Sequence, residues 1–191
     1  MKQDPPSAAP STPLDGRPSR VRYGVIALLG LAAGSAYLTW HAIAVANTTI
    51  QDELGIDDRR LGWVLGSFAL GYFLCQMLGN RLGNHAALAL ISSLWSLLTV
   101  WTSAVTAYVP LAASRVVFGM AQAGLVPISA KIINDWFPVA RRGVCSSVIG
   151  ASMSIGGVVA MGLIAWLMNY LDWRVIFHIY SLVGILWATA F

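Results

Sequence analysis

Long uncharged stretches recur along almost the whole chain. They cover residues 23–50, 61–80, 86–114, 116–130, 143–171 and 175–191. A helix that crosses a bilayer needs about 20 predominantly apolar residues. Divided at 106–110, the central run gives six predicted transmembrane helices, near 24–46, 61–80, 86–105, 109–133, 144–168 and 174–191. The expected fold class is therefore an all-α membrane protein with one six-span bundle over residues 23–191.

Composition supports this class and sets the N-terminal segment apart. Hydrophobic residues make up 57% of the chain and charged residues 10%, whereas soluble domains carry about 25% charged residues. Residues 1–22 hold five of the eight prolines and few large apolar side chains, so they are predicted to form a disordered cytoplasmic tail. The first apolar run exceeds the roughly 7–15 residues of a secretory signal core, and a retained span is expected.

Basic residues indicate the orientation of the spans. Eight of them fall in the tail and in the connections near 81–85 and 131–142: Lys2, Arg17, Arg20, Arg22, Arg81, Lys131, Arg141 and Arg142. The other three connections hold Arg59, Arg60 and Arg174. The positive-inside rule places the N-terminus in the cytoplasm of a multi-pass plasma (inner) membrane protein. The net charge of +4 thus reflects topology, and no nucleic-acid partner is expected. Three tryptophans at predicted span ends are expected to lie at the lipid interface: Trp101, Trp136 and Trp173.

Arg115 is the one charged residue well inside a predicted span. Arginine at the bilayer centre costs about 2.5–3.5 kcal/mol on insertion scales, so it usually faces a polar cavity, a ligand or a partner. The alternative is that Arg115 lies near a helix end and extends to the surface.

Polar side chains follow one face of the first span and one face of the fourth at helical spacing. The first stripe is Tyr37, His41, Ala44 and Thr48 with Asn47 beside it, and the second is Arg115, Gly119, Gln122 and Val126. Two such stripes predict a shared water-filled cavity. Arg115 would anchor a substrate carboxylate, since its planar fork matches that group. Tyr37, Asn47 and Gln122 would bond substrate hydroxyls, and His41 completes the predicted substrate-binding set.

Acidic residues are confined to the tail and the span ends, so no carboxylate of this chain can hold a proton at mid-membrane. His41 and His178 lie within spans, and histidine is the side chain that titrates near physiological pH. Either one could bind a transported proton, or simply pack against a neighbouring helix. Glycines at 119, 124, 156 and 157 indicate close helix packing. Pro127 is predicted to kink span four, and Pro138 to end it.

Two linked motifs carry a family resemblance. RVVFGMAQAGLVP at 115–127, followed by DWFPVARRG at 135–143, resembles the fourth span and next cytoplasmic loop of the major facilitator superfamily. The resemblance is strongest to its anion:cation symporter family, which carries organic acids, sugar acids and phosphate. It implies two six-helix halves around a midplane site. This chain would supply the N-terminal half, and the C-terminal half of the same transporter would be its partner.

The chain also departs from that family's pattern. The loop between spans two and three keeps Arg81 and Gly83 but has Asn80 in the motif that normally carries an acid. With Arg141 and Arg142 these residues form the gating and inner-loop motif that the resemblance implies. The first-span charges are replaced by Thr39 and Trp40, and the fourth-span glutamate by Gln122. Proton coupling is therefore expected to be absent or to pass through His41.

The leading functional hypothesis is transport of a small organic anion across the lipid bilayer by alternating access. A half-length membrane assembly subunit without transport activity is the first alternative. An intramembrane enzyme is the second, although the sequence has no Gly-x-Ser-x-Gly, no His-Glu-x-x-His and no acid within a span. No catalytic residue, metal or cofactor is expected.

Overall fold

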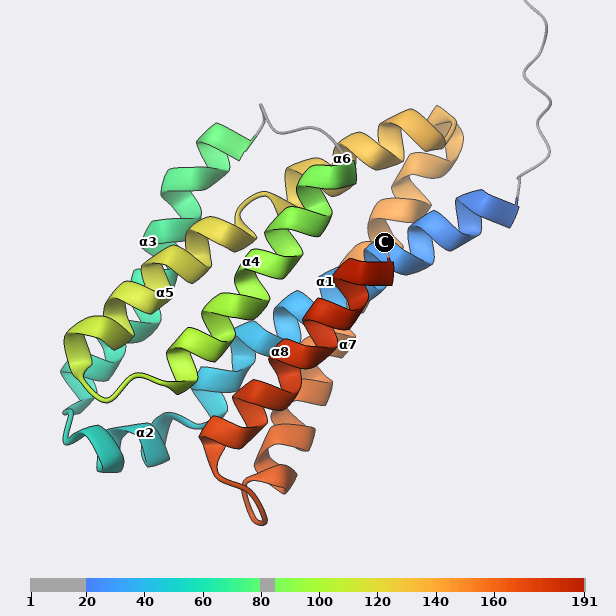
Figure 1. Cartoon of the computed structure of the whole chain (residues 1–191). Coiled ribbons are helices and arrows are strands. Elements are labelled where there is room, and N and C mark those ends of the chain that lie inside the picture. The colour runs from blue at the N-terminus through green and yellow to red at the C-terminus, as the bar shows by residue number, and fades with distance from the viewer. Residues whose placement is uncertain (1–19, 80–84, 191) are drawn as a thin grey trace, which may run out of the picture.

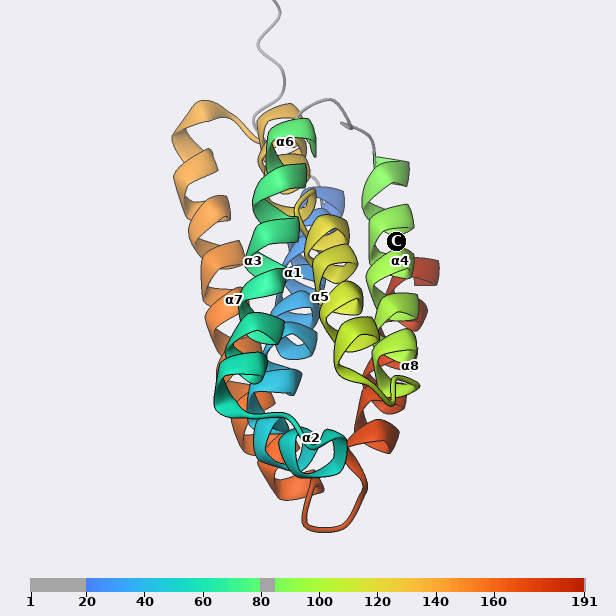
Figure 2. The ribbon, with the colours of Figure 1, turned by 90° about the vertical axis from the view of Figure 1, so that its left-hand side faces the viewer.

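The computed structural model describes residues 20–79 and 85–190, and every regular element in these ranges is helical. In chain order the helices are α1 (Arg20–Val45), α2 (Asn47–Leu54), α3 (Asp58–Gly79), α4 (His85–Ser103), α5 (Tyr108–Gln122), α6 (Leu125–Trp136), α7 (Val139–Leu167) and α8 (Trp173–Ala190). The long helices run lengthwise beside one another, while α2 lies across one end (Figures 1 and 2). With α5 and α6 taken as one broken rod, six rods follow the order of the six predicted spans.

Within the described residues, three segments are long and apolar enough to cross a membrane: 21–45, 108–136 and 139–167. Leu88–Ser103 and Trp173–Trp187 are shorter apolar helices. Helix α3 begins with Asp58, Arg59 and Arg60, which makes its first turn polar. The limits of the six predicted spans thus remain a prediction.

Two boundaries differ from those predicted. Helix α1 begins at Arg20, so residues 20–22 are helical and not part of a tail, and residues 1–19 lie outside the described residues. The connection after span one, expected to be a loop, contains α2. This short helix ends at Gly55, whose φ of 60° is the left-handed conformation that glycine adopts most readily.

The fourth span is broken near the predicted position. A turn at Ala123 and Gly124 separates α5 from α6. Pro127 has no N–H to donate to the carbonyl of Ala123, and its ring crowds that carbonyl. The interruption therefore lies one turn before the proline. Pro138 stands between α6 and α7, as expected for a residue that ends a helix.

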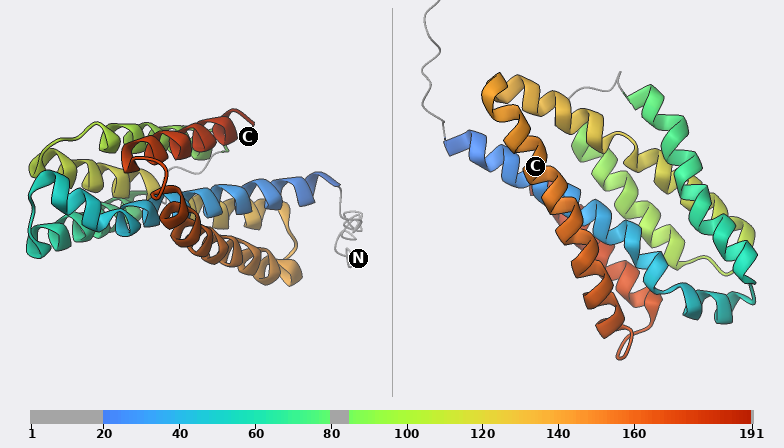
Figure 3. Two further views of the ribbon diagram at one scale, coloured as in Figure 1. Left: turned by 90° about the horizontal axis from the view of Figure 1, so that it is seen from below. Right: turned by 180° about the vertical axis from the view of Figure 1, so that it is seen from behind.

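Three helix pairs account for most of the packing: α1 with α7, α3 with α5, and α4 with α8. Helix α7 crosses over α1 when the bundle is viewed from behind (Figure 3). A Cβ atom on Gly156 would overlap the backbone of Gly34, and one on Gly119 would overlap the backbone of Phe68. These glycines allow close backbone contact, as is common between membrane helices.

A polar cluster joins the helices at the α2 end. Trp173 is 1% exposed, and its indole Nε1 donates to Glu53 Oε2 at 2.7 Å. Arg174 donates to Glu53 Oε1 and, through Nη1, to the backbone carbonyl of Ser103. The prediction that Trp173 lies at the lipid interface is therefore wrong, because the side chain is buried in a hydrophobic cluster inside the bundle and bonds to α2.

Candidate binding site

Arg115 on α5 is buried in the bundle, with 1% of its surface exposed. Its Nη2 donates to Thr102 Oγ1 at 2.9 Å, and its Cζ lies 4.9 Å from the centre of the Phe118 ring. Nε and Nη1 are buried and have no hydrogen-bond partner among the described residues. The side chain therefore does not extend to the surface. Its guanidinium is a buried cation with two nitrogen donors that lack partners among the described residues.

A cavity of about 260 Å³ borders this arginine. Its walls are Trp40, His41, Ile43, Ala44, Leu65, Phe68 and Arg115, and we call it the arginine pocket. Arg115 is the one charged residue in this wall. The wall thus brings together two of the predicted site residues, His41 from α1 and Arg115 from α5.

His41 is held from three sides. Nδ1 lies 2.9 Å from the carbonyl oxygen of Tyr37, and because a carbonyl can only accept, Nδ1 carries the hydrogen. The ring meets Trp40 edge-on at 4.6 Å. A Cβ on Gly157 of α7 would lie 3.3 Å from the ring. His41 is thus both a packed helix histidine and a residue of the pocket wall.

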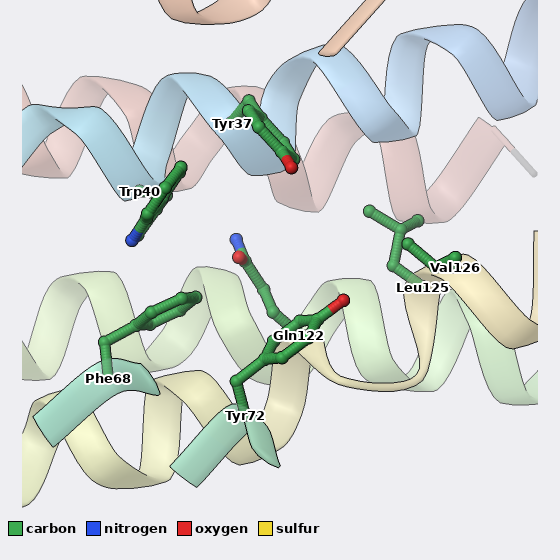
Figure 4. A pocket seen from close by; sticks show the side chains of 7 residues that line it. All are labelled: Tyr37, Trp40, Phe68, Tyr72, Gln122, Leu125 and Val126. Carbon is green, nitrogen blue, oxygen red and sulfur yellow. The ribbon is translucent and has the colours of Figure 1, made fainter. Parts of the chain in front are cut away.

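A second cavity, of about 190 Å³, adjoins the first. It is lined by Tyr37, Trp40, Phe68, Tyr72, Gln122, Leu125 and Val126, and we call it the tyrosine pocket (Figure 4). Gln122 Nε2 donates to the Ala36 carbonyl at 2.9 Å. The amide oxygen of Gln122 is a further acceptor group on this side chain. The rings of Tyr37 and Tyr72 project into the space between α1 and α3 (Figure 4).

Trp40 and Phe68 belong to both pockets. Their rings stack with centroids 5.4 Å apart and an interplanar angle of 29°. This stacked pair therefore stands between the cationic side and the hydroxyl-lined side of the cavity. Sequence reasoning did not select these two residues or Tyr72. Their aromatic side chains carry no charge that would distinguish them from apolar residues facing lipid or core.

Asn47 does not join the other predicted site residues. It begins α2, its Oδ1 accepts from the backbone N–H of Thr48 at 2.6 Å, and it lines neither pocket. The predicted stripe assumed a continuous helix from Tyr37 to Thr48, but α1 ends at Val45. Past that point the helical spacing no longer predicts which way a side chain faces.

Only part of the predicted inner-loop motif lies within the described residues. Asn80, Arg81 and Gly83 lie outside the described residues. Arg142 donates to the carbonyls of Asn134 at 2.9 Å and Phe137 at 3.1 Å, at the C-terminal end of α6, where a cation is favoured. Arg141 is exposed. The observed role of Arg142 is therefore to cap a helix.

Residues 29–191 match the family model of the Major Facilitator Superfamily. A galacturonate transporter of Dickeya chrysanthemi is 28% identical over 88% of this chain and 50% of that protein. A probable L-galactonate transporter of Escherichia coli K12 is 31% identical over 88% of this chain and 38% of that protein. The chain thus spans half or less of the length of these curated relatives.

Solved structures show the same fold. The crystal structure of a bacterial homologue of the human lysosomal transporter Spinster, inward-facing and unoccupied, superposes with a TM-score of 0.77 at 24% sequence identity. The match covers 90% of this chain and 42% of that one. The eight described helices therefore form roughly half of such a transporter fold.

Proposed function

Because the chain belongs to the major facilitator superfamily, a family of transporters and not of enzymes, we propose that it forms part of a carrier for sugar acids. The carrier moves a small organic anion across the membrane by alternating access. The sugar-acid transporters among its relatives support this substrate class. So does the chemistry of the two pockets.

The observation that carries the proposal is the state of Arg115. A buried guanidinium that lacks a carboxylate partner is costly, and here two of its nitrogens have no acceptor among the described residues. A substrate carboxylate in the arginine pocket would supply both the missing charge and the missing acceptors. Arg115 thus selects for an anion over a neutral sugar.

The tyrosine pocket suits the hydroxylated part of the same substrate. The Gln122 amide oxygen accepts hydrogen bonds, while the phenol groups of Tyr37 and Tyr72 can donate or accept them. Trp40 and Phe68, which line both pockets, would offer flat surfaces to the C–H groups between the two ends of the ligand. A molecule with a carboxylate at one end and hydroxyls along its length satisfies both pockets.

We further propose that a second six-helix half completes the cavity, because the relatives are about twice as long as this chain and superfamily sites lie between two halves. The N-terminus is proposed to face the cytoplasm of a plasma (inner) membrane. Symport and exchange both fit this arrangement, and uptake under an imposed pH gradient distinguishes them.

Uptake by cells that lack their own hexuronate carriers tests the proposal. The full natural gene product containing this chain is expressed, and uptake of labelled galacturonate, galactonate and galactose is compared. We expect uptake of one or both acids and none of galactose above the empty-vector control. Equal uptake of galactose, or no uptake of any acid by protein that is present in the membrane, would contradict the proposal.

A further inference from the structure

We propose that Thr102 is a positioning residue that holds the Arg115 guanidinium in its anion-binding geometry. The inference rests on the proposed function, in which Arg115 binds the substrate carboxylate. Thr102 lies on α4, next to its last residue, and is 0% exposed. Its hydroxyl is the one hydrogen-bond partner of the Arg115 guanidinium found among the described residues.

The donors and acceptors around the Thr102 hydroxyl explain why it accepts a hydrogen bond from Arg115. A threonine hydroxyl has one hydrogen and two lone pairs. Thr102 Oγ1 lies 2.8 Å from the Leu98 carbonyl, which can only accept, and 3.3 Å from Ser114 Oγ. With its hydrogen on the closer partner, Leu98, Thr102 turns its lone pairs toward Arg115 Nη2 at 2.9 Å.

A neutral acceptor suits this task better than a carboxylate. Arginine carries a long side chain with large rotamer freedom, so an unbonded guanidinium would sample many positions. An aspartate partner would fix it but would also neutralise the charge and compete with the substrate. Threonine fixes one nitrogen and leaves the full positive charge, with Nε and Nη1 unpaired, for an incoming anion.

The end of α4 that carries Thr102 is itself held in place. The carbonyl of the next residue, Ser103, accepts from Arg174 Nη1. Ser103 Oγ also lies 3.1 Å from His178 Nε2 on α8. The hydroxyl that Arg115 meets is therefore attached to a braced helix end, which is what a positioning contact requires.

Thr99 offers a matched control one turn earlier on the same helix. It is 1% exposed, and its Oγ1 donates to the Trp95 carbonyl at 2.9 Å. Thr99→Val thus removes the same kind of helix hydrogen bond as Thr102→Val but leaves the hydrogen bond from Arg115 to Thr102 in place. Both replacements keep the size of the side chain.

The experiment measures the concentration dependence of galacturonate or galactonate uptake in the full gene product, normalised to the amount in the membrane. For Thr102→Val we expect KM to rise about tenfold, because a guanidinium that holds its binding geometry only about a tenth of the time binds about tenfold more weakly. Thr102→Ser should restore KM, and Thr99→Val should leave it unchanged. A KM for Thr102→Val equal to that of Thr99→Val would overturn the inference.

Two further variants keep the outcomes distinct. If Thr102→Val does not reach the membrane, Thr102→Cys replaces it, since a thiol is a weak acceptor; a KM equal to that of Thr102→Ser would then overturn the inference. Arg115→Lys is measured in parallel. If it loses uptake while the Thr102 variants behave as wild type, only the positioning role is wrong. If it keeps full uptake, the proposed anion anchor is wrong as well.

Discussion

Glu53 on α2 and Arg174 on α8 form an ion pair, with 2.6 Å between Oε1 and Nη2. The second carboxylate oxygen accepts from Trp173 Nε1 at 2.7 Å. Hydrogen bonds from Arg174 and then from Trp173 lower the pKa of the Glu53 carboxyl below its ordinary value of 4.5, against a smaller opposing effect of burial. This pair ties the short helix α2 to the bundle at the end where α4 also meets α8.

The first prediction is a pH-dependent contribution of this pair to stability. A carboxyl whose pKa is lower in the folded state stabilises the fold above its ordinary pKa, and that contribution disappears as the pH falls through the lowered value. Glu53→Gln should therefore lower the melting temperature at pH 7, and the gap to wild type should close below about pH 4. The expected change in melting temperature is small, because the Arg174 and Glu53 side chains are 23% and 41% exposed.

Thermal unfolding in detergent between pH 7 and pH 3.5 measures this gap. Asp52→Asn is the control, since Asp52 lies on the same short helix and makes no ion pair among the described residues. A gap that stays constant across the pH range, or that equals the gap of Asp52→Asn, would show that the Glu53–Arg174 pair does not contribute in this way.

The second prediction concerns the charge geometry at Arg115. Arg115→Lys replaces a planar fork by a point charge, and Arg115→Ala removes the charge. We expect both to lose most sugar-acid uptake while the protein still inserts into the membrane. Unchanged uptake in both variants, at equal amounts of membrane protein, would mean that the guanidinium has no part in binding.

The third prediction concerns close packing of α1 and α7. A Cβ on Gly156 would overlap the Gly34 backbone, whereas a Cβ on Gly162 of the same helix meets nothing within 4 Å. Gly156→Ala should therefore lower the melting temperature in detergent. Gly162→Ala should leave it unchanged or raise it, because alanine favours a helix interior by about 1 kcal/mol over glycine. Equal effects of the two substitutions would contradict the packing account.

The fourth prediction concerns orientation. The connections at 47–57, 104–107 and 168–172 lie at the α2 end of the bundle, and the α6–α7 turn lies at the other end (Figure 2). We expect the α2 end outside the cell and the α6–α7 turn inside. Single cysteines at Asp57 and Arg142, placed in a background without Cys75 and Cys145, are labelled with an impermeant thiol reagent on intact cells. Labelling of Arg142→Cys but not Asp57→Cys would reverse the orientation.

The helical spacing of polar residues was sufficient to predict which side chains line the pockets wherever the helix is continuous. Tyr37, His41, Arg115 and Gln122 were chosen by helical spacing, and all four line the two pockets. The same rule misplaced Asn47, since α1 ends two residues before it. Helix ends depend on local turn geometry and on packing, which the spacing of polar residues does not encode.

Contacts between different helices could not be predicted from the sequence pattern. The bond from Arg115 to Thr102 joins two helices across a connection, and the bond from Trp173 to Glu53 spans 120 residues. A buried tryptophan at a span end has the same local sequence signature as one at the lipid interface. Only the tertiary arrangement distinguishes the two.

The last prediction concerns energy coupling. Among the described residues, every acid lies outside the two pockets, and at the two positions where the family resemblance would supply one stand Thr39 and Gln122. Thr39 bonds within its own helix, to the Ala36 carbonyl at 2.9 Å, and Gln122 bonds to that same carbonyl. Neither side chain can carry a proton between conformations.

Transport is therefore predicted either to exchange one anion for another without protons or to couple through His41, which shares the arginine pocket with Arg115. A coupling group must bind its proton in one conformation and release it in the other. The measurement is uptake by the full gene product in vesicles with an imposed pH gradient. Indifference to the gradient supports exchange, and a response abolished by His41→Gln supports the histidine. A strong response that survives His41→Gln would exclude both and assign the proton site to the other half of the carrier.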